Sequence, residues 1–247
     1  VLGSRGLGDV YKRQIIYKGA NMKKGFTLAE VLITLGIIGV VAAMTMPSLI
    51  QNHRKKVFAA KVKQTYALVS NALLTSVSEN GAPSTWDYGE KANNDGSTIV
   101  NNPKHIKKMA KQYFVPYFKN IKEGENTENY YIILNNSTVL SFNTDGVTSE
   151  DGIYTPNTLY ITASFNNNTS SYYDISRDYS KEDVIMFVNI NEENARVRFF
   201  NWADNNRDSI KNSSIYACNK NIAQNKRYQC GALIQIDNWE IRNDYPW

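Results

Sequence analysis

The chain has 247 residues, 42% of them hydrophobic, which is enough for one globular domain with a sizeable core and an appendage. Its formal net charge of +5 would ordinarily suggest nucleic acid or anionic lipid as a partner. Residues 1–25 hold six of the 28 basic residues and one of the 23 acidic residues, so residues 26–247 have 22 of each sign. Bulk charge therefore gives no argument for nucleic acid as a partner, although local basic patches remain.

Residues 1–21, VLGSRGLGDVYKRQIIYKGAN, have no usable hydrophobic periodicity. The first fourteen of them resemble a translated sequencing-library adaptor, and Met22 follows as a candidate start. We interpret residues 1–21 as a non-native or upstream segment that takes no part in the fold. The alternative is a genuine long cytoplasmic leader.

The segment from Phe26 to Met46 is almost entirely apolar and has the length of a membrane-spanning helix. Its single charged residue is Glu30, and a charge at the centre of such a helix costs roughly 2.5–3.5 kcal/mol, less towards the end. A cleaved secretory signal is not expected, because Glu30 interrupts the front of the apolar core and apolar residues continue past the small pair Ala42-Ala43. The segment is therefore predicted to be an anchor, and its carboxylate requires an explanation.

The run Lys23-Lys24-Gly25-Phe26-Thr27-Leu28-Ala29-Glu30-Val31-Leu32 resembles the prepilin signature of type IV pilins and type II secretion pseudopilins. The resemblance includes the glycine before the cleavage site, the phenylalanine that becomes the mature N-terminus, and the glutamate four residues after it. Pro47 occupies a position where this family often has a helix-kinking proline. The resemblance extends from Lys23 to about Gln51 and says little about the remaining 200 or so residues.

The resemblance implies that a membrane aspartyl protease, the prepilin peptidase, cuts after Gly25 on the cytoplasmic side and N-methylates Phe26. It implies a single-pass protein of the bacterial inner membrane, with a cytoplasmic N-terminus and a periplasmic C-terminal domain, that later enters a filament. The expected partners are other pilin or pseudopilin subunits, the peptidase, the inner-membrane assembly platform and membrane lipid.

The same resemblance explains Glu30. Cleavage at Gly25 creates a charged amine on Phe26 at the edge of the hydrocarbon, and two opposite charges that pair there offset each other's desolvation. Glu30 can meet the Phe26 amine of its own helix, four residues away, or that of a neighbouring subunit, in which case it fixes the register of assembly. The alternative is a tolerated charge near the helix end that snorkels to the interface.

The positive-inside rule orients Lys23 and Lys24 towards the cytoplasm. The cluster His53-Arg54-Lys55-Lys56 opposes this orientation, because it follows the far end of the apolar segment and would be exported. We interpret the cluster as a solvated helix face near lipid headgroups. Binding of nucleic acid or of an acidic partner is the alternative.

Helical periodicity continues beyond Pro47, which removes one backbone hydrogen bond and should bend the helix. An apolar stripe recurs at intervals of three and four residues: Val62, Tyr66, Val69, Leu73 and Val77. Asn80-Gly81 supplies a stop signal, so one helix is predicted from about Phe26 to Glu79. Its second half is amphipathic and must pack on something.

The remaining chain indicates a small domain. Residues 81–102 are predicted to form a loop, and residues 103–120 a basic amphipathic helix that Pro116 ends or kinks and that packs within the domain rather than on a membrane. Strands are predicted at residues 130–134, 138–142, 158–165, 184–190, 195–200 and 232–236. The expected fold is α+β and pilin-like: a long N-terminal helix, membrane-spanning in its first half, packed on a small antiparallel sheet.

The predicted organisation is a leader at residues 22–25, a transmembrane and assembly helix at 26–47, an amphipathic continuation at 48–80 and a periplasmic head domain at 81–247. In an oxidising compartment Cys218 and Cys230 are expected to form a disulfide. The C-terminal aromatic residues of NWEIRNDYPW are expected to pack within the domain.

No catalytic motif is present, and no cofactor is expected. The alternative is a calcium site, because acidic residues at 145, 150, 151, 204 and 208 offer oxygen ligands, although their spacing matches no defined calcium loop. The expected function is a structural subunit, a pseudopilin or minor pilin, of a type II secretion or type IV pilus-like filament. The alternatives are a membrane-tethered periplasmic enzyme or binding domain, and a DNA-uptake minor pilin.

Overall fold

The computed structural model describes residues 25–88, 103–119, 121–125, 130–148, 154–166, 182–201, 205–223 and 226–247. The chain divides into two compact units, residues 1–50 and residues 51–247. Helix α1, Leu28–Asn80, begins in the first unit and ends in the second.

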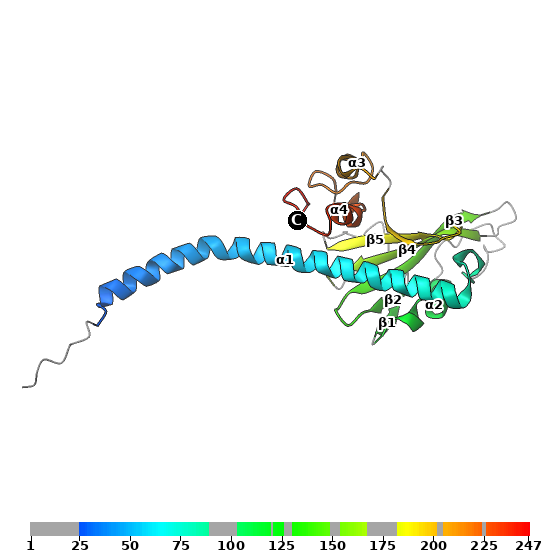
Figure 1. The fold of residues 1–247 in the computed structure, drawn as a ribbon, viewed down its shortest axis with the longest axis horizontal. Helices are drawn as coiled ribbons and strands as arrows, with labels where there is room; N and C mark the ends of the chain where they lie inside the picture. The colour runs from blue at the N-terminus through cyan, green and yellow to red at the C-terminus, as the bar shows by residue number, and fades with distance from the viewer. Residues whose placement is uncertain are drawn as a thin grey trace, which may run out of the picture. The chain divides into compact units, whose positions relative to one another are not determined.

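The second unit is an α+β domain built on one antiparallel sheet, as the sequence predicts (Figure 1). The sheet order is β1-β2-β3-β4-β5-β6, so every strand pairs with its neighbour in the chain. The strands are β1 Lys122–Glu125, β2 Tyr130–Ile133, β3 Val139–Thr148, β4 Tyr154–Ser164, β5 Asp183–Asn189 and β6 Val197–Phe199. The helices after α1 are η1 Pro83–Thr85, α2 Pro103–Tyr113, η2 Val115–Tyr117, α3 Arg207–Asn212 and α4 Cys230–Ile236.

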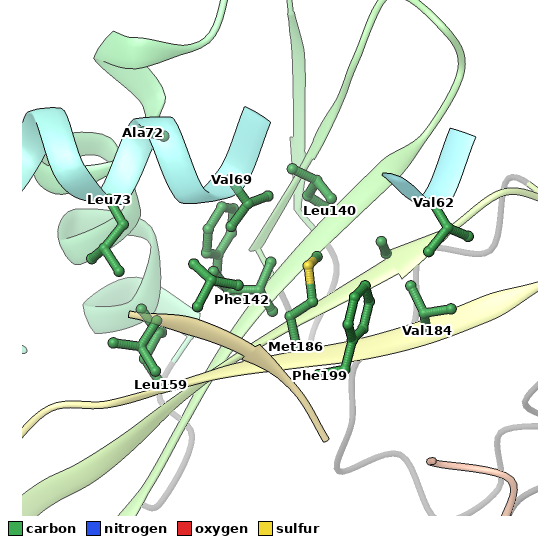
Figure 2. Close-up of a cluster of buried hydrophobic side chains, with 14 of the residues drawn as sticks. Val62, Val69, Ala72, Leu73, Leu140, Phe142, Leu159, Val184, Met186 and Phe199 are labelled. Atoms are coloured by element: carbon green, nitrogen blue, oxygen red, sulfur yellow. The ribbon is translucent and has the colours of Figure 1, made fainter. Parts of the chain in front are cut away.

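The amphipathic half of α1 packs on one face of this sheet (Figure 2). Three members of the predicted stripe are fully buried, Val62, Val69 and Leu73, and Tyr66 and Val77 lie partly buried against the same core. The sheet contributes the apolar side chains of its alternating inward positions, including Leu140, Phe142, Leu159, Ile161, Val184, Met186 and Phe199. The apolar stripe of α1 and the inward-facing residues of the strands therefore form one core.

Gly81 ends α1 at the predicted place. Its φ of +80° lies in the left-handed region, and its N–H donates to the carbonyl of Val77 over 3.0 Å. A glycine in this conformation satisfies a terminal carbonyl without the steric cost of a Cβ. The predicted boundary at Glu79 is correct to within one residue, since Asn80 is the last helical position.

Helix α2 packs within the domain, as predicted. Its apolar face is buried, with Ile106, Met109, Ala110 and Tyr113 in the core. Its basic face is paired: Lys107 with Glu125 (2.7 Å), Lys108 with Asp87 (2.6 Å) and Lys111 with Glu123 (2.8 Å). Regular helix ends at Tyr113, and Pro116 lies in the short turn η2.

The strands predicted from alternation are confirmed, but one predicted strand is wrong. Residues 232–236 form part of helix α4 instead. A short apolar run such as ALIQI does not distinguish a strand from a buried helical segment by periodicity alone. The preceding Gly231 lies so close to the ring of Phe199 that a Cβ at this position would overlap it. The short elements β1 and α3, of four and six residues, were not predicted.

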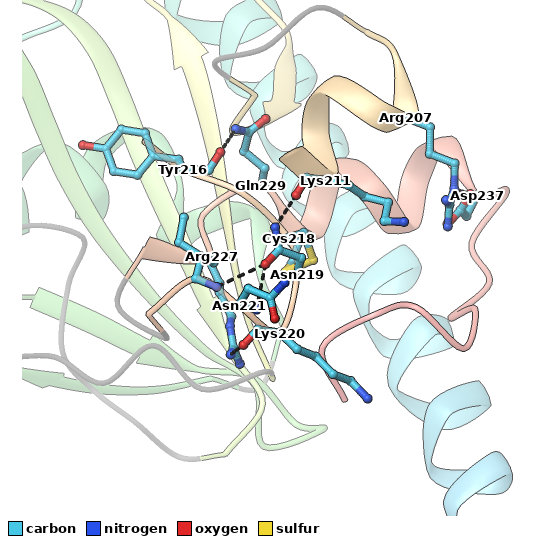
Figure 3. The surroundings of a disulfide bond; sticks show 12 residues. Arg207, Lys211, Tyr216, Cys218, Asn219, Lys220, Asn221, Arg227, Gln229 and Asp237 are labelled. Carbon is cyan, nitrogen blue, oxygen red and sulfur yellow. Dashed lines mark hydrogen bonds and ion pairs between the residues drawn. A yellow bond between two sulfur atoms is a disulfide. The ribbon is translucent and has the colours of Figure 1, made fainter. Parts of the chain in front are cut away.

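The C-terminal region is held together by the disulfide between Cys218 and Cys230, which the sequence predicts and the structure contains (Figure 3). Both cysteines are buried in the main core. The side chains of Gln229 and Asn219 donate to the carbonyls of Tyr216 and Lys211, respectively. The bond thus joins α4 to the irregular segment that follows α3.

An ion-pair network lies beside the disulfide. Arg207, the first residue of α3, donates to Asp237 through Nε (2.6 Å) and to Asp244 through a terminal nitrogen (2.8 Å). Lys211 also reaches Asp244, at 2.7 Å, and Arg242 reaches Asp237, at 3.2 Å. The hydrogen bonds from Arg207 and Lys211 hold the pKa of the Asp244 carboxyl well below its usual range. The network connects α3 and α4 to the C-terminal tail.

We predict that removal of the disulfide lowers stability without preventing membrane insertion. Closing a loop of this length contributes roughly 3 kcal/mol on chain-entropy grounds, so Cys218→Ser/Cys230→Ser should show a clearly lower unfolding midpoint in urea. In exported protein, both thiols should resist alkylation until a reductant is added. Free thiols in freshly isolated, exported protein would contradict both the bridge and the oxidising compartment.

Candidate functional site: the N-terminal segment

The predicted cleavage site lies in non-helical backbone directly before α1. Gly25 and Phe26 are exposed, and the Phe26 side chain is 87% exposed. A Cβ added at Gly25 would meet no atom within 4 Å. The fold of this chain therefore does not itself require glycine at position 25, and a requirement for glycine there would come from a processing enzyme.

Glu30 and Thr27 form a reciprocal cap on the first turn of α1. The Glu30 carboxylate accepts from the Thr27 N–H (2.8 Å) and from the Thr27 hydroxyl (2.9 Å), and the Thr27 hydroxyl accepts from the Glu30 N–H (3.2 Å). This is the capping-box arrangement, in which Thr27 precedes the helix and Glu30 is its third residue. The Glu30 carboxylate therefore already has local partners in this chain.

The contribution of Thr27 was not predicted, although the sequence contains a signal for it. The spacing Thr-x-x-Glu immediately before an apolar run is typical of a capping box. The two roles predicted for Glu30 were pairing with an amine at Phe26 and, as the alternative, a tolerated charge that snorkels to the interface. That amine does not exist in this chain, because Gly25 precedes Phe26. The structure thus assigns Glu30 a second, local role.

The apolar residues of the first unit are exposed on all sides of α1. The exposed side chains include Leu28, Leu32, Ile33, Leu35, Ile37, Ile38, Val40, Val41, Met44, Met46, Leu49 and Ile50. The hydroxyls of Thr34 and Thr45 donate to the carbonyls of Val31 and Val41 over 2.9 Å. Both hydroxyls therefore have hydrogen-bond acceptors within the helix. Among the described residues, α1 is the one helix long and apolar enough to cross a membrane.

Pro47 lies inside α1, after the apolar segment. Its missing N–H removes one helical hydrogen bond. The predicted bend at this position stays a prediction. The basic cluster at residues 53–56 follows six residues later, within α1 and at the start of the second unit.

The acidic residues considered for calcium do not form a site in the described part of the chain. Asp145 and Gly146 lie within β3 at a register shift, not in a turn, and the Asp145 carboxylate accepts from the Gly146 N–H over 2.8 Å. Asp208 lies in the first turn of α3. Residues 150, 151 and 204 lie outside the described residues, and those described contain no group of three or more potential metal ligands.

Two known families match this chain, and their matched segments meet at Pro47. Residues 20–46 match the prokaryotic N-terminal methylation motif, the prepilin-type signal of type IV pilins and pseudopilins. Residues 48–247 match a family of unknown function, DUF6613. Searches of curated proteins and of solved structures gave no match. The chain thus carries a prepilin-type signal and, because the second match covers most of its length, it belongs to the DUF6613 family.

Proposed function

We propose that this protein is a structural subunit, a pseudopilin or minor pilin, of a type II secretion or type IV pilus-like filament. In this proposal residues 22–25 are the leader, cleavage falls between Gly25 and Phe26, and Phe26 is N-methylated. Residues 26–47 anchor the subunit in the inner membrane and later form the core of the filament. The proposal is supported by the methylation motif, which is typical of pilin-like structural subunits.

One observation carries the proposal: the apolar surface of α1 is exposed on all sides in the first unit. In water such a surface is unfavourable by roughly 25 cal/mol per Å². Lipid can cover it while the subunit is in the membrane, and apolar helices of neighbouring subunits can cover it afterwards. A helix that served only to join two domains would need neither apolar residues on all sides nor a peptidase cleavage site before its N-terminus.

The principal alternative is a membrane-tethered periplasmic enzyme or binding domain that uses the same signal only as an anchor. A tethered enzyme would be active without Glu30 and without neighbours, whereas a filament subunit depends on both. A DNA-uptake minor pilin is the third possibility, and it predicts binding of DNA by the head domain. The zero net charge of residues 26–247 counts against it.

We predict that the mature, membrane-extracted protein begins at Phe26 and carries a methylated amine. Gly25 and Phe26 lie in exposed, non-helical backbone, where a peptidase can reach the peptide bond. Mass spectrometry of the N-terminal peptide measures both the terminus and the added mass. A terminus after Ala43, or an intact Met22 in cells with an active prepilin peptidase, would exclude processing as a prepilin.

A further inference from the structure

A basic cavity lies beside α1 in the second unit. Its volume is about 640 Å³, and its lining includes Lys55, Lys56, Lys63, Trp239, Glu240 and Ile241. The lysines are on α1, and the other three residues follow α4. All of these residues belong to the second unit, so the cavity is defined within that unit alone.

The charges of this cavity are unbalanced. Three ammonium groups line it against one carboxylate, and no described carboxylate forms an ion pair with Lys55, Lys56 or Lys63. This contrasts with α2, whose lysines 107, 108 and 111 all have acidic partners in the domain. Since residues 26–247 carry no net charge, a local excess of lysines without an ion pair among the described carboxylates is not a consequence of composition. It indicates an anionic partner from outside the chain.

Trp239 forms a fixed aromatic wall of the cavity. Asn238 and Trp239 both have φ in the left-handed region, +56° and +64°, which is uncommon for a bulky residue. The Trp239 N–H donates to the carbonyl of Ile234 over 2.8 Å, so the turn that ends α4 holds this conformation. The indole packs against Tyr66 at 5.7 Å between ring centroids, and the Lys63 ammonium lies 5.7 Å from its centroid.

Chain connectivity favours lipid as the partner. Lys55 follows Ile50, the last residue of the first unit, by only five residues of α1. The apolar residues 26–46 that make α1 a candidate membrane span belong to that first unit. Tryptophan is enriched at the membrane interface, and lysines close to a membrane end are attracted to anionic lipids. A second cavity, of about 310 Å³, is lined by Arg54, Lys61 and Trp247 together with the acidic residue Glu182.

We propose that the cavity binds the phosphodiester headgroup of an anionic phospholipid, with Lys55, Lys56 and Lys63 as its cationic contacts and Trp239 as the interfacial wall. This inference rests on the proposed anchoring of α1 in a membrane. It also accounts for the exported basic cluster that opposes the positive-inside rule, because a cationic cavity on the far side is then retained by lipid.

The test uses the full-length protein in neutral detergent micelles and native mass spectrometry with added phosphatidylglycerol or phosphatidylcholine. Wild type should retain phosphatidylglycerol in preference to phosphatidylcholine, and salt should weaken the retention. Each basic residue near an anionic surface contributes about a fivefold gain. Lys55→Gln/Lys56→Gln/Lys63→Gln should therefore bind phosphatidylglycerol roughly 100-fold more weakly.

Two matched variants make the result specific. Lys119→Gln/Lys122→Gln/Lys220→Gln removes the same charge from exposed positions elsewhere and should bind phosphatidylglycerol as wild type does. Lys55→Arg/Lys56→Arg/Lys63→Arg keeps the charge and should retain binding. The proposal is overturned if the first triple variant binds normally, if both lipids bind equally, or if a short DNA duplex displaces the lipid at equal concentration. The measurement does not depend on cleavage at Gly25 or on assembly, so its failure would leave the proposed function standing.

Discussion

Subunits with Glu30→Val are expected to insert and to be cleaved at Gly25, but to enter filaments about two orders of magnitude less often than wild type. We expect neither insertion nor cleavage to need the carboxylate. Assembly needs it if Glu30 of one subunit pairs with the Phe26 amine of the next. Removal of one member of a buried pair leaves the other charge unpaired and costs about 3–5 kcal/mol. Co-purification or crosslinking with wild-type filaments measures incorporation, with cleavage and the membrane fraction as controls.

The cap between Glu30 and Thr27 makes a sharper comparison possible. Glutamine also serves in a capping box, so Glu30→Gln keeps the local hydrogen bonds and removes only the charge. Thr27→Val does the reverse: it removes the cap, at about 1 kcal/mol, and keeps the carboxylate. If charge pairing governs assembly, Glu30→Gln should fail as Glu30→Val does, and Thr27→Val should assemble nearly normally.

The opposite pattern would show that Glu30 acts only as a helix cap. Normal incorporation of Glu30→Gln together with poor incorporation of Thr27→Val would mean that the carboxylate organises its own helix rather than its neighbour. Normal incorporation of cleaved Glu30→Val would show that assembly needs neither the charge pair nor the cap. The three variants therefore separate two functions of one side chain, one between subunits and one within the first turn of α1.

Local patterns in the sequence were sufficient for most of the fold. Helix α1 could be predicted because its apolar stripe and its stop at Gly81 depend on residues close together in the chain. The strand pairs were predictable because alternation and short polar turns are also local. Four of the five connections between consecutive strands have seven residues or fewer, and such short connections bring each strand beside the next in antiparallel order. The exception is the connection of 18 residues between β4 and β5.

The predictions that were wrong or missing concern features that depend on tertiary contacts. Residues 232–236 are helical because α4 packs against β6, with Gly231 directly against Phe199, and this contact is absent from the local sequence. The strand β1 was missed because its sequence, KEGE, has no apolar alternation; its pairing with β2 and the ion pairs to α2 define it. The basic cavity was not predicted either, because Lys63 and Trp239 lie 176 positions apart in the sequence.

The same dependence on distant contacts makes Arg207 a sensitive position. The Asp237 side chain is 3% exposed, and Arg207, 30 residues away, is its closest cationic partner at 2.6 Å. Asp237 also lies at the C-terminal end of α4, where the helix dipole disfavours a negative charge. Arg242 is more exposed and lies farther away, at 3.2 Å. Arg207 therefore carries most of the compensation for this buried carboxylate.

We predict that Arg207→Met lowers the free energy of unfolding by about 3 kcal/mol, because it keeps the side-chain volume but leaves Asp237 largely uncompensated. For a domain of this size, such a loss lowers Tm by roughly 6–12 °C. Arg198→Met is the matched control: its pair with Glu192 is also short, at 2.6 Å, but both side chains are about one-third exposed, so the loss should be at most about 1 kcal/mol.

Arg207→Met/Asp237→Asn should recover much of the lost stability, because the buried charge disappears together with its partner. Thermal unfolding of the full-length, disulfide-bonded protein at neutral pH measures all three variants. Equal losses in Arg207→Met and Arg198→Met would contradict a buried ion pair, as would a double variant less stable than Arg207→Met. Recovery in the double variant would show instead that the lost stability of Arg207→Met comes from the unpaired carboxylate of Asp237. Arg207 would then be the residue that compensates the charge of this buried carboxylate.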